Sequence, residues 1–217
     1  MSDDAFTLAV AQTCLSPGDT TANLTVMSAL TGQAAACGAD LILFPELAPT
    51  CYGVGAALRD LAEPADGPSF AHLAEAARDH GIAVCYGYAE RDGAERVGKE
   101  YDGAELYNSA ALAGVELIAV PTATVSYDST SRFSEMVIAA RATENNVFVA
   151  YANHCGSDGD YDYMGKSIIA GPLTDIYALA AAEPALLIAR LDRARLAEGE
   201  ARVPYRRDRR PELYGDL

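Results

Sequence analysis

The sequence predicts an α/β domain, and three observations support this prediction. Segments with the periodicity of amphipathic helices alternate with short apolar segments of strand length along the chain. Residues 39–44 end in the continuous apolar run LILF, which is typical of a strand covered on both faces. The chain has 217 residues, of which 50% are hydrophobic, so it can bury one large core. No linker interrupts the pattern, and we expect a single domain over residues 1–217.

The first expected strand covers residues 6–12, where the sequence FTLAVAQ is largely apolar. A helix is expected over residues 20–37. Asp19 or Thr20 can cap its first turn by accepting a hydrogen bond from a free backbone amide. Gly38 is expected to end the helix, because glycine readily adopts the left-handed conformation found after many helices.

The next elements lie between the apolar strand and the middle of the chain. Residues 69–80 have helical spacing and stop at Gly81. A strand is expected at residues 82–88. Residues 91–103 are polar and rich in glycine, which predicts a turn, and residues 105–110 are expected to form the returning strand of a hairpin.

The second half repeats the alternation of strands and helices. A helix is expected at residues 131–144 and a loop at residues 156–163. Residues 202–217 read as an irregular, arginine-rich tail. Strands are expected at residues 116–120, 147–153, 166–170 and 185–191, the last two separated by a turn at Gly171 and Pro172.

The charge balance narrows the classes of partner. With 16 basic and 31 acidic residues, the net charge is −15, which argues against nucleic acid and against anionic membrane surfaces. The amino-terminal sequence MSDDAF is acidic, unlike a signal peptide, and no apolar run is long enough to span a bilayer. Five scattered cysteines without a CxxC motif favour free thiols in a reducing compartment. We therefore expect a cytoplasmic protein.

Glu46 is the strongest single candidate for chemistry. It directly follows the apolar strand, and ligands of α/β sheets gather at the carboxyl ends of strands. Its neighbours are apolar, and partial desolvation suits a carboxylate to general-base work. The alternative is a loop glutamate that caps a neighbouring amide, and the residues alone leave both interpretations open.

Other motifs give weaker signals. His72 and His80 lie on one predicted helix at a spacing that does not match a metal pair, so we expect no metal site and no cofactor. His154 and Cys155 are adjacent, so on an extended chain their side chains point to opposite faces and cannot pair as base and nucleophile. Cys51 lies five residues after Glu46, although a free cysteine is usually a small buried hydrophobe. The basic segment 202–211 is expected to dock within the chain or between subunits.

Several strings in series resemble the carbon–nitrogen hydrolases of the nitrilase/amidase superfamily, and single-domain aliphatic amidases most of all. They are LAVAQ (8–12), ADLILFPELAPTCYG (39–53), ERDG (90–93), LYNSA (106–110), ALAGVELIAVPTA (111–123), ARATENNVFVAYANHCG (140–156), GKSIIAGP (165–172) and YRRDRRPELY (205–214). The resemblance implies a four-layer α-β-β-α sandwich that self-associates as a homodimer or a larger homo-oligomer. It also implies hydrolysis of small linear amides, with release of ammonia.

The resemblance also implies roles for residues. Members of the family use a Glu, a Lys and a Cys, and Glu46 matches the position of the glutamate that acts as general base. In the thiol mechanism a cysteine attacks the amide carbon, while an ammonium and a backbone amide stabilise the oxyanion. Tyr52, Pro121 and Thr122 are candidates for the lining of the substrate pocket.

The chain departs from the family between LYNSA and ALAG. There Ala110 runs directly into Ala111, without the family's YRK-like and ICYD-like motifs that carry the lysine and the cysteine. Lys99 and Lys166 lie in other motifs, and no cysteine takes the nucleophile position. This internal deletion implies one shortened sheet and an impaired or inactive hydrolase. The alternatives are an unrecognised nucleophile, or a silent relative that binds small amides or serves as an oligomeric scaffold.

Overall fold

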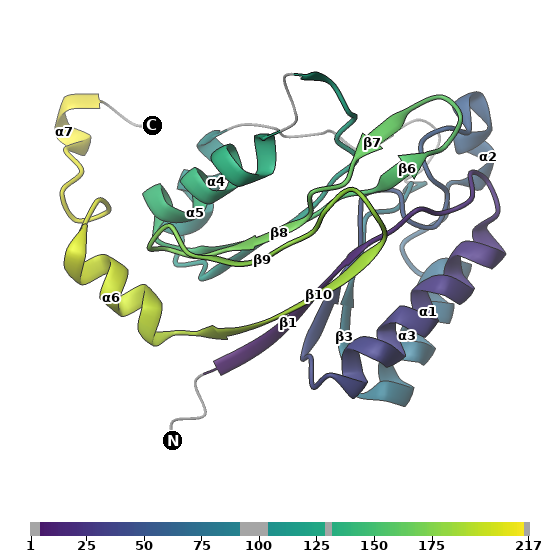
Figure 1. The fold of residues 1–217 in the computed structure, drawn as a ribbon, viewed down its shortest axis with the longest axis horizontal. Helices are drawn as coiled ribbons and strands as arrows, with labels where there is room; N and C mark the ends of the chain where they lie inside the picture. The colour runs from purple at the N-terminus through teal and green to yellow at the C-terminus, as the bar shows by residue number, and fades with distance from the viewer. Residues whose placement is uncertain (1–4, 92–103, 129–131, 215–217) are drawn as a thin grey trace.

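The computed structural model describes residues 5–91, 104–128 and 132–214 (Figure 1). One four-stranded sheet has the order β10-β1-β2-β3, in which β1, β2 and β3 are parallel and β10 is antiparallel to β1. Its strands are β1 (Ala5–Gln12), β2 (Leu41–Leu43), β3 (Ala83–Cys85) and β10 (Ala185–Asp192). The parallel strands place their carboxyl ends at one edge of the sheet.

A second four-stranded sheet has the order β4-β5-β8-β9, with β4 and β5 parallel. A separate hairpin, β6-β7, follows β5. These strands are β4 (Leu117–Pro121), β5 (Phe148–Ala152), β6 (Cys155–Ser157), β7 (Asp162–Met164), β8 (Ile168–Ala170) and β9 (Ile176–Leu179).

Helices cover the outer faces of the two sheets (Figure 1). α1 (Thr20–Ala36) and α3 (Pro68–His80) lie on the first sheet. α4 (Ala104–Leu112), the π-helical turn η3 (Ser134–Ile138) and α5 (Ala139–Asn145) lie on the second. The shorter η1 (Gly55–Ala57) and α2 (Leu58–Leu61) follow β2, and α6 (Ala194–Arg202) and α7 (Pro211–Tyr214) follow β10. Within these ranges no helix is long and apolar enough to cross a membrane.

Strand β1 shows why the order of layers is α-β-β-α. Leu8 and Val10 point between the sheets, where they pack with Phe148 of β5. Ala9 and Ala11 point the other way, into the cluster under the first helical layer. All four β1 residues are completely buried, which explains the apolar sequence of a strand covered on both faces. The predicted α/β class and the four layers are confirmed.

The predicted helix boundaries are confirmed where capping residues mark them. Asp19 accepts a hydrogen bond from the Ala22 amide at 3.0 Å and so caps α1. Gly38, beyond the end of α1, has a φ of 78°, and Gly81 after α3 has a φ of 65°. Glycine adopts this left-handed backbone without a steric penalty, so both helices end where the sequence predicts.

The strand predicted at residues 105–110 is wrong, because these residues belong to helix α4. The sequence AELYNSAAL has no Gly, no Pro and no β-branched residue, and it is rich in helix formers. Tyr107 and Ala111 are four residues apart, so they share one face and pack on the second sheet. Of the polar turn predicted at residues 91–103, all but Arg91 lies outside the described residues.

Three further predictions need correction. The segment 156–163, predicted as a loop, contributes to the β6-β7 hairpin. The turn expected between the last two strands contains a further strand, β9, which is short and half exposed and has no clear alternation. The tail is not irregular throughout, since Pro211–Tyr214 form α7.

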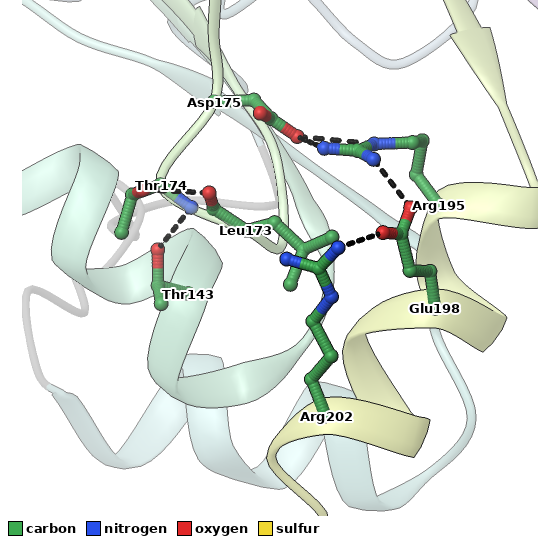
Figure 2. Close-up of polar contacts among 7 residues, drawn as sticks. All are labelled: Thr143, Leu173, Thr174, Asp175, Arg195, Glu198 and Arg202. Atoms are coloured by element: carbon green, nitrogen blue, oxygen red, sulfur yellow. Dashed lines mark hydrogen bonds and ion pairs between the residues drawn. The ribbon is translucent and has the colours of Figure 1, made fainter.

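Polar contacts attach α6 to the turn between β8 and β9 (Figure 2). Arg195 donates two hydrogen bonds to Asp175, at 2.6 and 3.2 Å, and also pairs with Glu198. In the same turn the Thr174 amide donates to the Thr143 hydroxyl of α5 at 3.1 Å. In the basic segment 202–211, Arg206 donates to the Ala111 carbonyl at the end of α4, at 3.3 Å. This contact is internal docking, one of the two roles that the sequence suggested for the segment.

Candidate functional site

Glu46 lies in a strained loop at the carboxyl end of β2. After Phe44 the chain turns through residues 45–51, in which Leu47 has a φ of 47° and Cys51 a φ of 60°. These left-handed conformations are unusual for residues other than glycine, and they collect at functional sites. The turn leaves Glu46 half-buried, between a buried proline and a buried leucine.

Hydrogen bonds hold both the side chain and the backbone of Glu46 in place. The Tyr52 hydroxyl donates to Glu46 Oε1 at 2.5 Å. The Glu46 amide donates to the Thr122 carbonyl at 3.4 Å, and His154 Nε2 lies 2.6 Å from the Glu46 carbonyl oxygen. The loop therefore joins the two sheets where their parallel strands end.

The structure brings together the four residues that the sequence singled out for the site. Thr122 follows Pro121, the last residue of β4, and its amide donates to the Ala152 carbonyl at 2.9 Å. Tyr52 reaches Glu46 from the far end of the same loop. All four residues lie at the carboxyl ends of β2 and β4, where α/β sheets commonly bind ligands.

Threonine, tyrosine and asparagine side chains extend this polar end of the second sheet. The Thr122 and Thr124 hydroxyls lie 3.2 Å apart, and Thr124 also bonds the Tyr151 hydroxyl. Asn153 is completely buried, and it accepts from the Thr124 amide at 2.8 Å and donates to the Thr124 carbonyl at 3.1 Å. The sequence analysis missed Asn153, although an asparagine directly after the apolar run FVAYA is itself a signal.

The β6-β7 hairpin supplies a second carboxylate that the sequence analysis missed. Asp158 accepts hydrogen bonds from the Gly53 amide at 2.7 Å, the Tyr163 hydroxyl at 2.6 Å and the Tyr161 amide at 2.9 Å. Burial raises the pKa of the Asp158 carboxyl, but these hydrogen bonds outweigh it and the pKa is lowered overall. Asp158 is therefore a charged anchor for the backbone next to Tyr52. Its role depends on a contact 105 residues away in sequence.

Two buried thiols near this end of the molecule are poorly suited to nucleophilic attack. Burial raises the pKa of Cys51 from 9.0 to about 12, with added effects of Asp158 and Cys14. Burial likewise raises the pKa of Cys155 to about 12. Cys51 packs in the cluster beneath α1, and its sulfur accepts from Asn23 at 3.9 Å. Because the thiolate is the reactive species, both thiols are expected to be inert.

The remaining candidates do not form a site with Glu46. His72 and His80 are exposed on α3, and the described part of the chain has no group of three or more His, Cys, Asp or Glu residues that could hold a metal ion. Lys166 Nζ lies 3.9 Å from Glu135, and Lys99 lies outside the described ranges. Two surface cavities, of about 380 and 480 Å³, are lined by other residues than Glu46. The smaller is lined by Phe6 and Leu117, which lie near the amino-terminal ends of β1 and β4, and so it opens at the opposite end of these strands from Glu46.

Comparisons with known proteins support one family. A sequence profile described as carbon-nitrogen hydrolase matches residues 7–113 and 104–200. A hydrolase encoded in the pqqF 5' region of Pseudomonas protegens is 36% identical over 236 aligned residues, which cover 84% of this chain and 82% of that protein. Human deaminated glutathione amidase is 30% identical over 138 residues, but these span only 38% of its length.

Solved structures support the fold. A mutant of the amidase from Nesterenkonia sp. AN1, with the acetamide moiety of fluoroacetamide added at its active site cysteine, superposes with a TM-score of 0.81. The superposition covers 98% of this chain and 97% of that chain at 24% identity. At this level of identity the likeness concerns the fold alone.

Proposed function

Because the chain belongs to the carbon–nitrogen hydrolase family, we propose that it is an amidase-like member whose site is built around Glu46. The observation that carries this proposal is the placement of the Glu46 carboxylate at the carboxyl end of β2, with a hydrogen bond from Tyr52 at 2.5 Å. Glu46 acts as general base: it takes a proton from a water that attacks the amide carbon and returns it to the nitrogen as the C–N bond breaks and ammonia leaves. Tyr52, Pro121 and Thr122 line the pocket of a short linear amide, and Tyr52 also orients the carboxylate.

The proposed hydrolysis is impaired in this chain. By motif position the lysine and the nucleophilic cysteine are missing, which leaves Glu46 alone of the three catalytic groups. Cys51 and Cys155 do not compensate, because their pKa values of about 12 keep the thiolate form rare. Loss of a covalent nucleophile and of an oxyanion partner lowers rates on the order of 10⁴-fold or more.

Two features of the comparisons support an internal deletion. The 236 positions aligned with the Pseudomonas relative use only 84% of this 217-residue chain, about 182 residues, so many positions of the relative have no counterpart here. The family profile matches in two separate stretches, residues 7–113 and 104–200, which overlap at residues 104–113. This junction coincides with the step from Ala110 to Ala111, where the sequence departs from the family.

The second candidate function is binding without hydrolysis, in which Glu46, Tyr52 and Thr122, at the carboxyl ends of β2 and β4, hold a small amide. The buried thiols favour it, since a site without an activated nucleophile can still form hydrogen bonds to an amide. In either case we propose a cytoplasmic, single-domain protein over residues 1–217. We further propose that it self-associates as a homodimer or a larger homo-oligomer.

Ammonia release from a panel of short aliphatic amides tests the proposed hydrolysis. We expect slow release that Glu46→Gln abolishes while the circular dichroism spectrum stays that of the parent. Release that is unchanged in Glu46→Gln would exclude Glu46 as the base. Calorimetric titration with the same amides separates the two functions: heat of binding without ammonia supports the binder, and the absence of both refutes the amide site.

A further inference from the structure

The backbone on which Glu46 lies needs an external restraint. Leu47 and Cys51 both adopt left-handed conformations, with φ values of 47° and 60°. A non-glycine residue keeps such a conformation only where its surroundings impose it. The loop is restrained by its own hydrogen bonds and by contacts with Gly18, Asn23 and Gly87. Two further contacts come from a segment more than 100 residues further along the chain, and one of them holds Glu46 itself.

His154 holds the backbone of Glu46 from the side of the second sheet. Its Nε2 lies 2.6 Å from the Glu46 carbonyl oxygen, and because a carbonyl only accepts, this nitrogen carries the proton. The ring is 3% exposed, and burial lowers the pKa of His154, which favours the neutral form. Hydrogen bonds to the Glu46 and Thr13 backbones and the charge of Asp158 act in the opposite direction, but burial outweighs them. The ring therefore acts as an N–H donor to the Glu46 carbonyl.

The β6-β7 hairpin in turn holds His154 and the far end of the loop. The Tyr163 ring packs on the His154 ring, with centroids 5.2 Å apart. The Tyr163 hydroxyl donates to Asp158, which also accepts from the Gly53 amide. A Cβ at Gly53 would lie 2.6 Å from the Asp158 carboxyl carbon, so only glycine allows this close approach.

These contacts form a continuous network that begins at the Glu46 carbonyl and ends at the Glu46 carboxylate. One arm runs from the Glu46 carbonyl through His154 and Tyr163 to Asp158. The other returns from Asp158 through Gly53 to its neighbour Tyr52, whose hydroxyl donates to the Glu46 carboxylate. The backbone and the carboxylate are thus held by separate contacts that meet at Asp158, and together these contacts set both the position and the direction of the side chain.

We propose that His154 is a positioning residue for Glu46, and that the β6-β7 hairpin locks it in place through Tyr163 and Asp158. The inference deepens the proposed function, on which its catalytic consequence rests. Its geometric part concerns only the environment of Glu46 and is measurable without turnover.

Carbon-13 NMR of the glutamate side-chain carboxyls tests the geometric part in the full-length protein. The Glu46 signal is assigned by its absence in Glu46→Gln. We expect His154→Leu, which removes the donor, to move this signal toward the position of a solvent-exposed glutamate. His154→Gln, which keeps an N–H donor, restores at least half of the change. His72→Leu, a control on the exposed face of α3, leaves the signal in place.

Two results overturn the inference. One is a folded His154→Leu variant with an unchanged Glu46 signal, and the other is an equal change in the Leu and Gln variants, which indicates a merely structural role. Should His154→Leu fail to fold, Tyr163→Phe keeps the ring and removes only the hydroxyl donor to Asp158. We expect it to move the Glu46 signal in the same direction by a smaller amount, and no movement refutes the lock.

Kinetics distinguish failure of the inference from failure of the proposed function. If the parent releases ammonia, His154→Leu is expected to lower kcat on the order of 100-fold with KM changed less than threefold, because a displaced base is misaligned in the transition state. His154→Gln recovers most of this loss. A parent without turnover refutes the hydrolase and leaves the NMR result as the test of positioning.

Discussion

The reactivity of Cys51 and Cys155 toward a small aromatic disulfide reagent tests whether either buried thiol can be an activated nucleophile. Burial raises the pKa of both from 9.0 to about 12. Three pKa units lower the thiolate fraction at neutral pH about 1,000-fold relative to an ordinary thiol.

The greater basicity of these thiolates partly offsets the lower thiolate fraction, because a more basic thiolate reacts faster. Nucleophilicity rises with pKa with a Brønsted coefficient of about 0.45, so three units give about a 20-fold faster thiolate. The net expectation is a reaction about 50-fold slower than that of an ordinary thiol. Burial of both sulfurs, at 3% and 2% residue exposure, slows it further by limiting access.

The assay is residue-resolved mass spectrometry of the native protein over time at pH 7.5. The exposed Cys37 provides the internal reference, and Cys37→Ser identifies its signal. We expect Cys51 and Cys155 to react at least about 50-fold more slowly than an unstructured cysteine peptide. Should either react as fast as that peptide while the protein stays folded, the reasoning from burial to inertness is refuted.

The remaining predictions concern stability. Asp19→Ala removes the cap of α1 and is expected to lower the free energy of unfolding by about 1 kcal/mol in urea denaturation, whereas Asp19→Asn, which still caps, costs little; equal losses would contradict the cap. Leu43→Ala, at a completely buried position between the sheets, is expected to cost about 3 kcal/mol, and a loss below about 1 kcal/mol would contradict the close packing. The lowered pKa of Asp158 means that its contribution to stability is present above the ordinary value of 3.8 and lost as the pH falls through the folded-state value. Asp158→Asn should therefore flatten the decline of the unfolding free energy below about pH 4, and parallel curves would contradict its hydrogen bonds.

The parts of the fold that follow from local sequence could be predicted. Asp19, Gly38 and Gly81 mark helix ends through capping and left-handed backbone, which depend on near neighbours alone. Helix α4 is a segment for which the prediction is wrong. The expectation of a hairpin strand at residues 105–110 gave too little weight to the residues themselves, which favour a helix whose apolar face packs on the second sheet.

In the candidate site, too, residues marked by the local sequence could be predicted, and residues that depend on distant contacts could not. Glu46 is predicted as a candidate because it directly follows a buried strand, and the structure places the Tyr52 hydroxyl on its carboxylate. The roles of His154 and Asp158 could not be predicted, since their partners in the loop lie 108 and 105 residues away. Their position directly after an apolar strand is a local signal for the buried polar residues Asn153 and His154, whereas Asp158 is only half-buried and has no such signal.

The proposed function holds that Glu46 works in this fold without any thiol that forms a covalent intermediate. Acid quenching during incubation with short aliphatic amides, followed by intact-protein mass spectrometry, tests it directly, because an acyl-enzyme adds the mass of the acyl group. We expect no added mass at any time point. An acyl adduct on a cysteine, located by peptide mapping and lost in the matching Cys→Ala variant, would contradict it.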